Sequence, residues 1–232
     1  MPGIQKVFRT RACIAGLSLF ASAFAVDAND MRVIKVLESC LSPDGRLSVA
    51  KIRRDDGNTF AFIDSSTYRL LGDVLSASDT RDISNIAMLA SWNEDKSKVA
   101  VLIHYGTKGS AIKIFVKDPG GAFNPVRFDW PDAISVFEKL KHVKLAVRAA
   151  AGAPEDTLGP WITKDVICLN AGDARTIEGV NKHVFVRFKV RVKNRRAKII
   201  DASPFGIFSD QKASEYLENI GSRYWHIPEE SQ

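Results

Sequence analysis

The clearest chemical pattern in this chain lies between Lys182 and Lys198, where eight residues are Lys or Arg and none is acidic. Basic and apolar residues alternate along it. Successive side chains of a β-strand point to opposite faces of the sheet, so this strand would present one apolar face and one basic face. The basic residues predicted to share a surface, continuing into the turn after the strand, are Arg187, Lys189, Arg191, Lys193, Arg195 and Arg196.

Two interpretations of this basic stretch are open. In the first it is only the solvated face of an amphipathic strand, whose Lys residues also discourage edge-to-edge pairing. In the second it docks an anionic partner, such as an envelope polymer or an acidic protein surface. Same-face residues are about 6.5–7 Å apart, so the row would be about 20 Å long and would suit a repeating anion. Aromatic residues are sparse in the stretch, which argues against nucleic acid.

Signatures of catalysis are missing from the sequence. It contains no G-x-S-x-G, H-E-x-x-H, G-x-x-x-x-G-K-[ST], C-x-x-C or D-x-[DN]-x-[DN]-G pattern. The four histidines are scattered without metal-ligand spacing, so we expect no metal and no cofactor. The four tryptophans could line a carbohydrate site, but strand packing is the simpler interpretation. The chain therefore favours a non-catalytic binding protein; the alternatives are a hydrolase with an unrecognised site and a self-assembling structural or accessory protein.

The N-terminus has the pattern of a secretory signal peptide, residues 1–25. Three basic residues precede an apolar run over 12–24 that closes with Ala23-Phe24-Ala25. The run is too short to span a bilayer, and no later apolar run reaches 18 residues. We therefore expect export to the periplasm or beyond, with no transmembrane segment after signal removal. The remaining chain has 30 basic and 27 acidic residues, a formal charge of +3.

Two cysteines, Cys40 and Cys168, lie outside the signal peptide. Exported proteins meet an oxidising compartment, where an even number of cysteines suggests a disulfide. The alternative is that both are small buried hydrophobic residues.

The elements before the basic strand repeat with a shift of 51 residues. Asp44 falls on Asp95, each in a turn that leads into a strand candidate, 47–54 or 98–105. Each unit has four short strand candidates, and the run over 99–103 is apolar on both faces, as in a strand covered on both sides. A period near 50 with four strands is typical of propeller blades.

The stretch Ser42-Pro43-Asp44-Gly45-Arg46 resembles the blade motif of TolB-like β-propeller proteins, and 92–100 is a second copy without the Pro and Gly. The resemblance covers about 100 residues and implies a structural role for the motif. A closed propeller needs typically 4–8 blades, and only two units are present. The sheets of the two units must therefore pack against each other or against the C-terminal part of the chain.

We expect a mainly β chain with two blade-like four-stranded antiparallel units over 26–130 and an α+β region with two helices over 131–232. In that region the pattern predicts a helix over 132–148, a strand over 161–169, a hairpin of 184–193 with 197–201, and a helix over 210–220. The hairpin positions the basic row.

If the signal peptide is cleaved after Ala25, exported protein should begin at Val26 or a few residues later. Edman sequencing of protein recovered from outside the cytoplasm tests this. Membrane-bound material with an intact Met1 would contradict it.

Overall fold

The computed structural model describes residues 32–80, 85–106, 109–128, 132–145, 147–150, 156–177, 179–209 and 212; for 147–150, 205 and 208 it describes the backbone alone. The expected signal peptide and Val26 therefore lie outside the described residues. So does the helix expected over 210–220, apart from its residue 212. Within the described residues, no helix has the length and apolar character needed to cross a bilayer.

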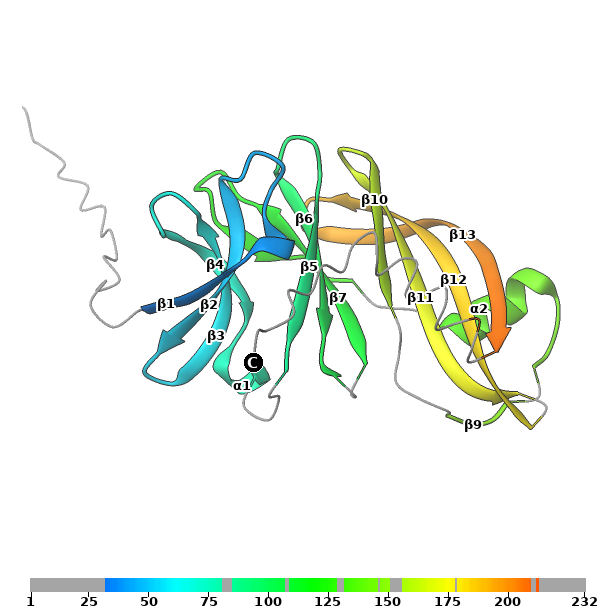
Figure 1. Ribbon diagram of the computed structural model, residues 1–232. Coiled ribbons are helices and arrows are strands. Elements are labelled where there is room, and N and C mark those ends of the chain that lie inside the picture. The colour runs from blue at the N-terminus through cyan, green and yellow to red at the C-terminus, as the bar shows by residue number, and fades with distance from the viewer. Residues whose placement is uncertain are drawn as a thin grey trace, which may run out of the picture. The chain divides into compact units, whose positions relative to one another are not determined.

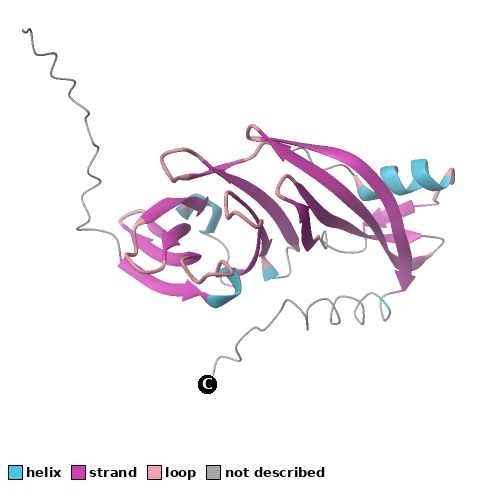
Figure 2. Ribbon diagram, turned by 90° about the horizontal axis from the view of Figure 1, so that it is seen from above, coloured by secondary structure: helices cyan, strands magenta, loops and turns pink. Residues whose placement is uncertain are grey.

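Strands dominate the structure and form three antiparallel sheets (Figures 1 and 2). The first sheet has the order β1 (Arg32–Leu37), β2 (Leu47–Arg54), β3 (Gly57–Asp64) and β4 (Leu70–Leu75). The second has the order β5 (Ala87–Trp92), β6 (Lys98–His104), β7 (Ser110–Lys117) and β8 (Phe123–Pro125). Short helical segments, η1 (Glu38–Cys40) and α1 (Ala77–Thr80), come after β1 and β4.

The third sheet has the order β10 (Thr157–Thr163), β11 (Val166–Ile177), β12 (Val180–Lys193) and β13 (Arg196–Ser209). A short strand, β9 (Val147–Ala150), pairs with the far end of β11. Helix α2 (Ala133–Lys141) precedes β9, and its side chains Ala133, Ile134 and Phe137 are buried in the same core as this sheet. The described part of the expected α+β region is therefore mostly sheet, a five-stranded antiparallel sheet with the one helix α2, and the second expected helix lies outside the described residues.

The turns that open β2 and β6 are equivalent, as the repeat predicts. Asp44 Oδ1 accepts from the backbone N–H of Arg46, and Asp95 Oδ1 accepts from that of Ser97, at 3.3 and 2.9 Å. The residue after each Asp, Gly45 or Lys96, has a φ of 69° or 56°. Gly adopts this left-handed conformation without a steric penalty, whereas the Cβ of Lys96 makes it unfavourable. The Lys96 ammonium lies 2.7 Å from the Asp44 carboxylate, so an ion pair joins the two turns.

The second sheet is apolar on both faces because it lies between the other two. One face contributes Val99, Val101 and Ile103 to a core shared with the first sheet. The opposite face contributes Ala100 and Leu102 to a core shared with the third sheet and α2. Figure 1 shows this arrangement, with β5–β8 between β1–β4 and β10–β13. The sequence-based expectation of a strand covered on both sides is confirmed.

Aromatic side chains fill the core between the first two sheets. The Phe62 ring is fully buried and lies 4.9 Å from the Phe115 ring, 4.7 Å from the Phe123 ring and 6.0 Å from the Trp92 ring, between centroids. At the edge of this core, Gly72 lets β8 approach β4, since a Cβ there would lie 2.3 Å from the Phe123 carbonyl oxygen. The two sheets therefore depend on one closely packed aromatic group.

Two boundaries in the third sheet differ from those expected. The helix over 132–148 is shorter: Asp132 caps its start, His142 ends it at a φ of 55°, and residues 147–150 form β9 instead. Pairing with β11 overrides the helical pattern there. The strand over 161–169 is divided by a turn at Lys164 and Asp165, and the Asp165 carbonyl accepts from the Val192 N–H at 2.8 Å. Neither the pairing of residues 147–150 with β11 nor the hydrogen bond between Val192 and Asp165 could be predicted from local sequence periodicity.

Replacing Phe62 with Ala should destabilise the protein by about 3–5 kcal/mol, because it empties the aromatic core between two sheets. Replacing Tyr68, which is 51% exposed, with Ala should change stability by less than about 0.5 kcal/mol. Urea unfolding followed by tryptophan fluorescence measures both. Equal effects of the two substitutions would contradict the description of this core.

Candidate functional site

The basic row lies on β12 and has the alternation that the sequence predicts. Arg187, Lys189, Arg191 and Lys193 are exposed, whereas the Val and Phe residues between them have no exposed surface. The buried side chains belong to the core shared with the second sheet. The basic face therefore points away from that sheet. Phe185 lies on the same face as Arg187 but is fully buried, so the exposed part of the row begins at Arg187.

The first two cations of the row have polar neighbours on the adjacent strands. Arg187 Nε donates to Asn170 Oδ1 at 3.1 Å, and Asn170 in turn donates to Thr157 Oγ1. The Lys189 ammonium lies 2.7 Å from the Asp201 carboxylate. This ion pair raises the pKa of Lys189 and lowers that of Asp201. The third sheet thus supplies polar partners for two of the four cations on β12.

The cations nearer the hairpin are arranged differently, because each faces another cation on β13. Arg191 is directly opposite Lys198, and Lys193 is directly opposite Arg196. Directly opposed side chains in an antiparallel pair have Cβ atoms about 4.5–5.5 Å apart, and like charges in this position destabilise the pair. All four are exposed, and in the described part of the chain none of them forms an ion pair. We call Arg191, Lys193, Arg196 and Lys198 the C-terminal cation cluster.

The hairpin that joins β12 to β13 adds a fifth cation in an unfavourable conformation. Asn194 and Arg195 have φ values of 50° and 59°, as in a type I′ turn, where the second position usually holds Gly. A left-handed conformation costs a residue with a Cβ roughly 1–2 kcal/mol. The turn therefore keeps Arg195 exposed at the tip of the hairpin despite its conformational cost.

Two further basic residues reach the hairpin from distant parts of the sequence. The Arg127 backbone pairs with the hairpin, donating to the Arg195 carbonyl and accepting from Ala197 N–H, both at 3.3 Å. Lys164 lies in the turn whose carbonyl at Asp165 accepts from Val192 N–H. Sequence reasoning missed both, since only the tertiary fold brings them near.

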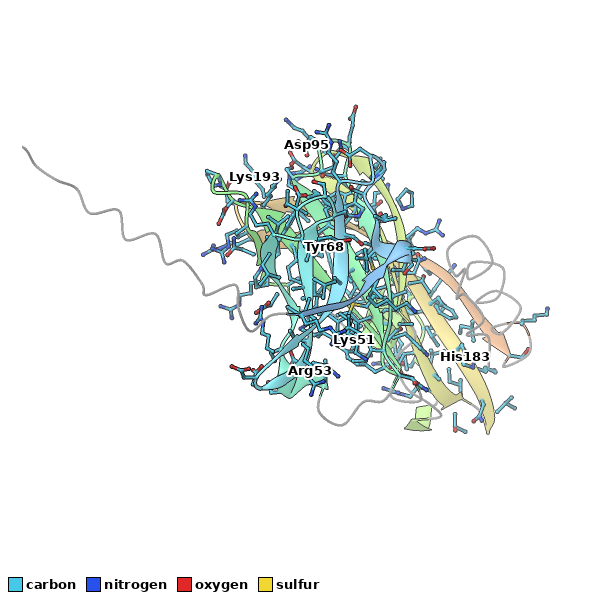
Figure 3. All side chains as sticks on the ribbon, turned by 60° about the vertical axis from the view of Figure 1, so that its left-hand side comes forward. Lys51, Arg53, Tyr68, Asp95, His183 and Lys193 are labelled. Carbon is cyan, nitrogen blue, oxygen red and sulfur yellow. The ribbon has the colours of Figure 1, made fainter. Side chains whose placement is uncertain are left out.

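The nearest described acidic side chains already have partners. The Asp165 carboxylate lies 2.8 Å from the Lys98 ammonium, which lowers the pKa of Asp165. Asp201 is paired with Lys189. Figure 3 shows Lys193 at the same end of the structure as Asp95 in the turn before β6. Lys193 also contributes to the lowered pKa of Asp165, so this carboxylate offsets part of the charge of the C-terminal cation cluster, which keeps an excess of positive charge.

A separate cavity of about 300 Å³ lies between the edge strands β5 and β10. Two tryptophans line it, but both indole N–H groups are used within the protein: Trp92 donates to the Cys40 carbonyl and Trp161 donates to the Ser91 carbonyl. Trp92 also packs edge-on against Phe62 and Phe123. The packing interpretation thus accounts for both. Trp130 and Trp225 lie outside the described residues.

Among the described carboxyl groups, Asp156 has a pKa that is strongly raised. Burial, with a smaller contribution from the nearby Asp173 carboxylate, raises the pKa of Asp156 to about 7 despite a hydrogen bond from the Gly172 N–H that opposes the shift. Asp173 itself lies 2.6 Å from Arg175. Raised carboxyl pKa values occur at active sites, but structural networks also produce them. The cavity between β5 and β10 is lined by neither residue.

Among the described residues, no group of three or more His, Cys, Asp or Glu side chains could hold a metal ion. His142 is exposed at the end of α2, and His104 ends β6 with its ring half-buried. No protein-family model, curated protein or solved structure matches this chain.

The two described cysteines are free thiols in the structure. Cys40 is buried in the core between the first two sheets, whereas Cys168 is half-buried on β11, directly opposite Lys189. No disulfide joins them in this structure, and the pairing expected from the sequence stays a prediction. Burial raises the pKa of the Cys40 thiol to about 12.

Iodoacetamide should label Cys168 faster than Cys40 in the folded protein, because a buried thiol with a raised pKa forms little thiolate. Mass spectrometry of peptides measures the labelling of each site. Unfolding in urea without a reductant should make both thiols reactive at similar rates. Two unreactive cysteines under those conditions would show that they are bridged after all.

Proposed function

We propose that this chain is an exported, non-catalytic binding protein whose third sheet docks an anionic polymer of the bacterial envelope. The observation that carries the proposal is the pair of directly opposed like charges in the C-terminal cation cluster. Cross-strand pairs contribute about 0.2–1 kcal/mol each when their charges are complementary, and like charges act in the opposite sense. A bound polyanion would place negative charge between the opposed cations and turn repulsion into attraction.

The neighbouring positions support a binding role over simple solvation of the sheet. One register step away, the same two strands carry a complementary pair, Lys189 and Asp201. A strand pair that needed only a polar surface could use complementary pairs throughout. Protection of an exposed edge explains only half of the cluster: Arg196 and Lys198 lie on the edge strand β13, but Arg191 and Lys193 lie on β12, which is paired on both sides.

A polymer suits the geometry better than a small anion does. Same-face residues along a strand are about 6.5–7 Å apart and opposed ones about 5 Å apart, so the four cations form a small two-dimensional array. Repeating charges on a chain can contact several of them at once, whereas a single small anion contacts one or two. An acidic protein surface is the outcome to be distinguished by experiment.

For the fold, we infer that the first two sheets are related repeats of the blade-like kind seen in TolB-like propellers. Their identical strand order and equivalent Asp turns support this inference. In such repeats the Asp motif is structural, so binding is assigned to the third sheet rather than to the turns.

Replacing Lys198 with Glu tests the proposed function, because the same substitution should raise stability and weaken binding to a polyanion. The substitution should raise stability by about 0.2–1 kcal/mol, since Arg191 would then face a carboxylate. It should also lower the salt concentration at which the protein elutes from immobilised dextran sulfate. Elution at the parent's salt concentration would mean that the cluster is only a solvated face.

Lys139 to Glu is the matched control, because it makes the same charge change at an exposed site on α2. It should elute close to the parent protein. Retention of the parent should fall steeply with salt, because exposed charges are screened within about 8 Å at physiological ionic strength. If the parent binds an immobilised acidic protein domain but not dextran sulfate, the partner class is protein instead of polymer.

A further inference from the structure

A second group of opposed cations lies on the first sheet, where the sequence shows no comparable basic run. On β1 and β2, Arg32 is directly opposite Arg53, and Lys35 is directly opposite Lys51. Lys51 and Arg53 are two residues apart, so they share one face of β2. All four side chains therefore gather on one face. We call Arg32, Lys35, Lys51 and Arg53 the N-terminal cation cluster.

A β-bulge creates this arrangement. The register between β1 and β2 shifts between Val33 and Lys35, so that Ile34 has no partner on β2. Without the bulge, Ile34 would share the face of Arg32, and Lys35 would point to the opposite face. The bulge thus adds a fourth cation to the face and leaves Ile34 49% exposed. Bulges commonly re-aim a side chain in this way near functional sites.

The charges around the N-terminal cation cluster leave it unneutralised. Three of its cations are exposed and Lys51 is half-buried, and within the described residues none of the four forms an ion pair. Arg54, on the opposite face of β2, is the residue that binds the Asp73 carboxylate, at 2.7 Å. Acidic residues near the cluster in the sequence are Asp55 and Asp56, exposed in the turn after β2, Glu38, exposed in η1, and Asp30, which lies outside the described residues.

Edge protection accounts for only part of this cluster. Arg32 and Lys35 lie on β1, an edge strand of the first sheet, where charges discourage pairing with another chain. Lys51 and Arg53 lie on β2, which is paired on both sides. Their positive charges add repulsion within the sheet without protecting an edge.

We infer that the N-terminal cation cluster is a second binding surface for an anionic polymer, so that one chain can engage the polymer at two places. The choice of polymer class rests on the function proposed for the C-terminal cation cluster, whereas the existence of the second surface rests on the β1–β2 register alone. The two clusters are on different sheets, separated by the second sheet. Figure 3 shows Lys51 and Arg53 together and well apart from Lys193.

Two surfaces on one chain have a consequence that one surface does not. A polymer long enough to reach both binds the second in an intramolecular step, at a high effective concentration. A short chain occupies each surface independently. The protein should therefore bind two short anionic chains, and it should bind a long one more tightly than either surface alone allows.

Isothermal titration calorimetry with short and long dextran sulfate tests this inference. The parent should bind two short chains, and the Lys51→Glu, Arg53→Glu variant should bind one. The variant's affinity for the long polymer should fall at least about tenfold, since avidity is lost. Lys139→Glu, Lys141→Glu, with the same charge change on α2, should behave as the parent. Asp55→Asn, Asp56→Asn should bind more tightly, because two nearby negative charges are removed.

The outcomes separate this inference from the proposed function. One short chain per parent molecule, with Lys51→Glu, Arg53→Glu binding as the parent does, would overturn the second surface and leave the first intact. If Lys198→Glu binds as the parent and only Lys51→Glu, Arg53→Glu is impaired, the proposed function fails and the second surface stands. Should the Glu variant unfold, Lys51→Gln, Arg53→Gln removes the charges with less repulsion, and full binding by that folded variant would overturn the inference.

Discussion

The fold depends on the second sheet, whose strand β6 is covered on both faces. Along β6, five consecutive residues from Val99 to Ile103 are at most 1% exposed, so the strand needs an apolar layer on each side. Full burial of such a side chain stabilises the folded state by about 1.5–3 kcal/mol. The first sheet covers one face with an aromatic group around Phe62, and the third sheet and α2 cover the other. This requirement decides which faces of the outer sheets are free to be polar.

The charge pattern results from that arrangement. Because Val190 and Val192 must face the second sheet, Arg191 and Lys193 must face outward. The layers do not, however, require the residues opposite them on β13 to be cations as well. The same holds on β2, where a bulge brings Lys35 opposite Lys51. Packing explains why the charges on β12 face outward, and the proposed anion binding accounts for the like signs of the opposed residues.

The sequence predicts the local elements well where two-residue alternation is strong. The hairpin of β12 and β13, the doubly covered β6 and the equivalent turns at Asp44 and Asp95 all follow from alternation and turn chemistry. It fails where a distant partner decides the outcome. Residues 147–150 continue a helical pattern but pair with β11, and the turn at Lys164 carries no Gly or Pro to mark it.

For the candidate site, too, local alternation predicts part of the arrangement and distant partners decide the rest. Alternation is enough to predict that Arg187 to Lys193 share an exposed face. It cannot show that Lys189 is neutralised by Asp201 while Arg191 faces Lys198, because cross-strand register depends on bulges in β13 that no local pattern reveals. The resemblance to propeller blades concerns the first two sheets, whereas the proposed binding surfaces depend on cross-strand register in the first and third.

A double-mutant cycle between Arg191 and Lys198 tests the central claim most directly. Unfolding free energies of the parent, the two single Ala variants and the double Ala variant give the coupling between the two cations, with and without dextran sulfate. The account predicts an unfavourable coupling in dilute chloride that becomes neutral or favourable when the polymer is bound. A coupling of zero, or an unfavourable coupling that the polymer leaves unchanged, would contradict it.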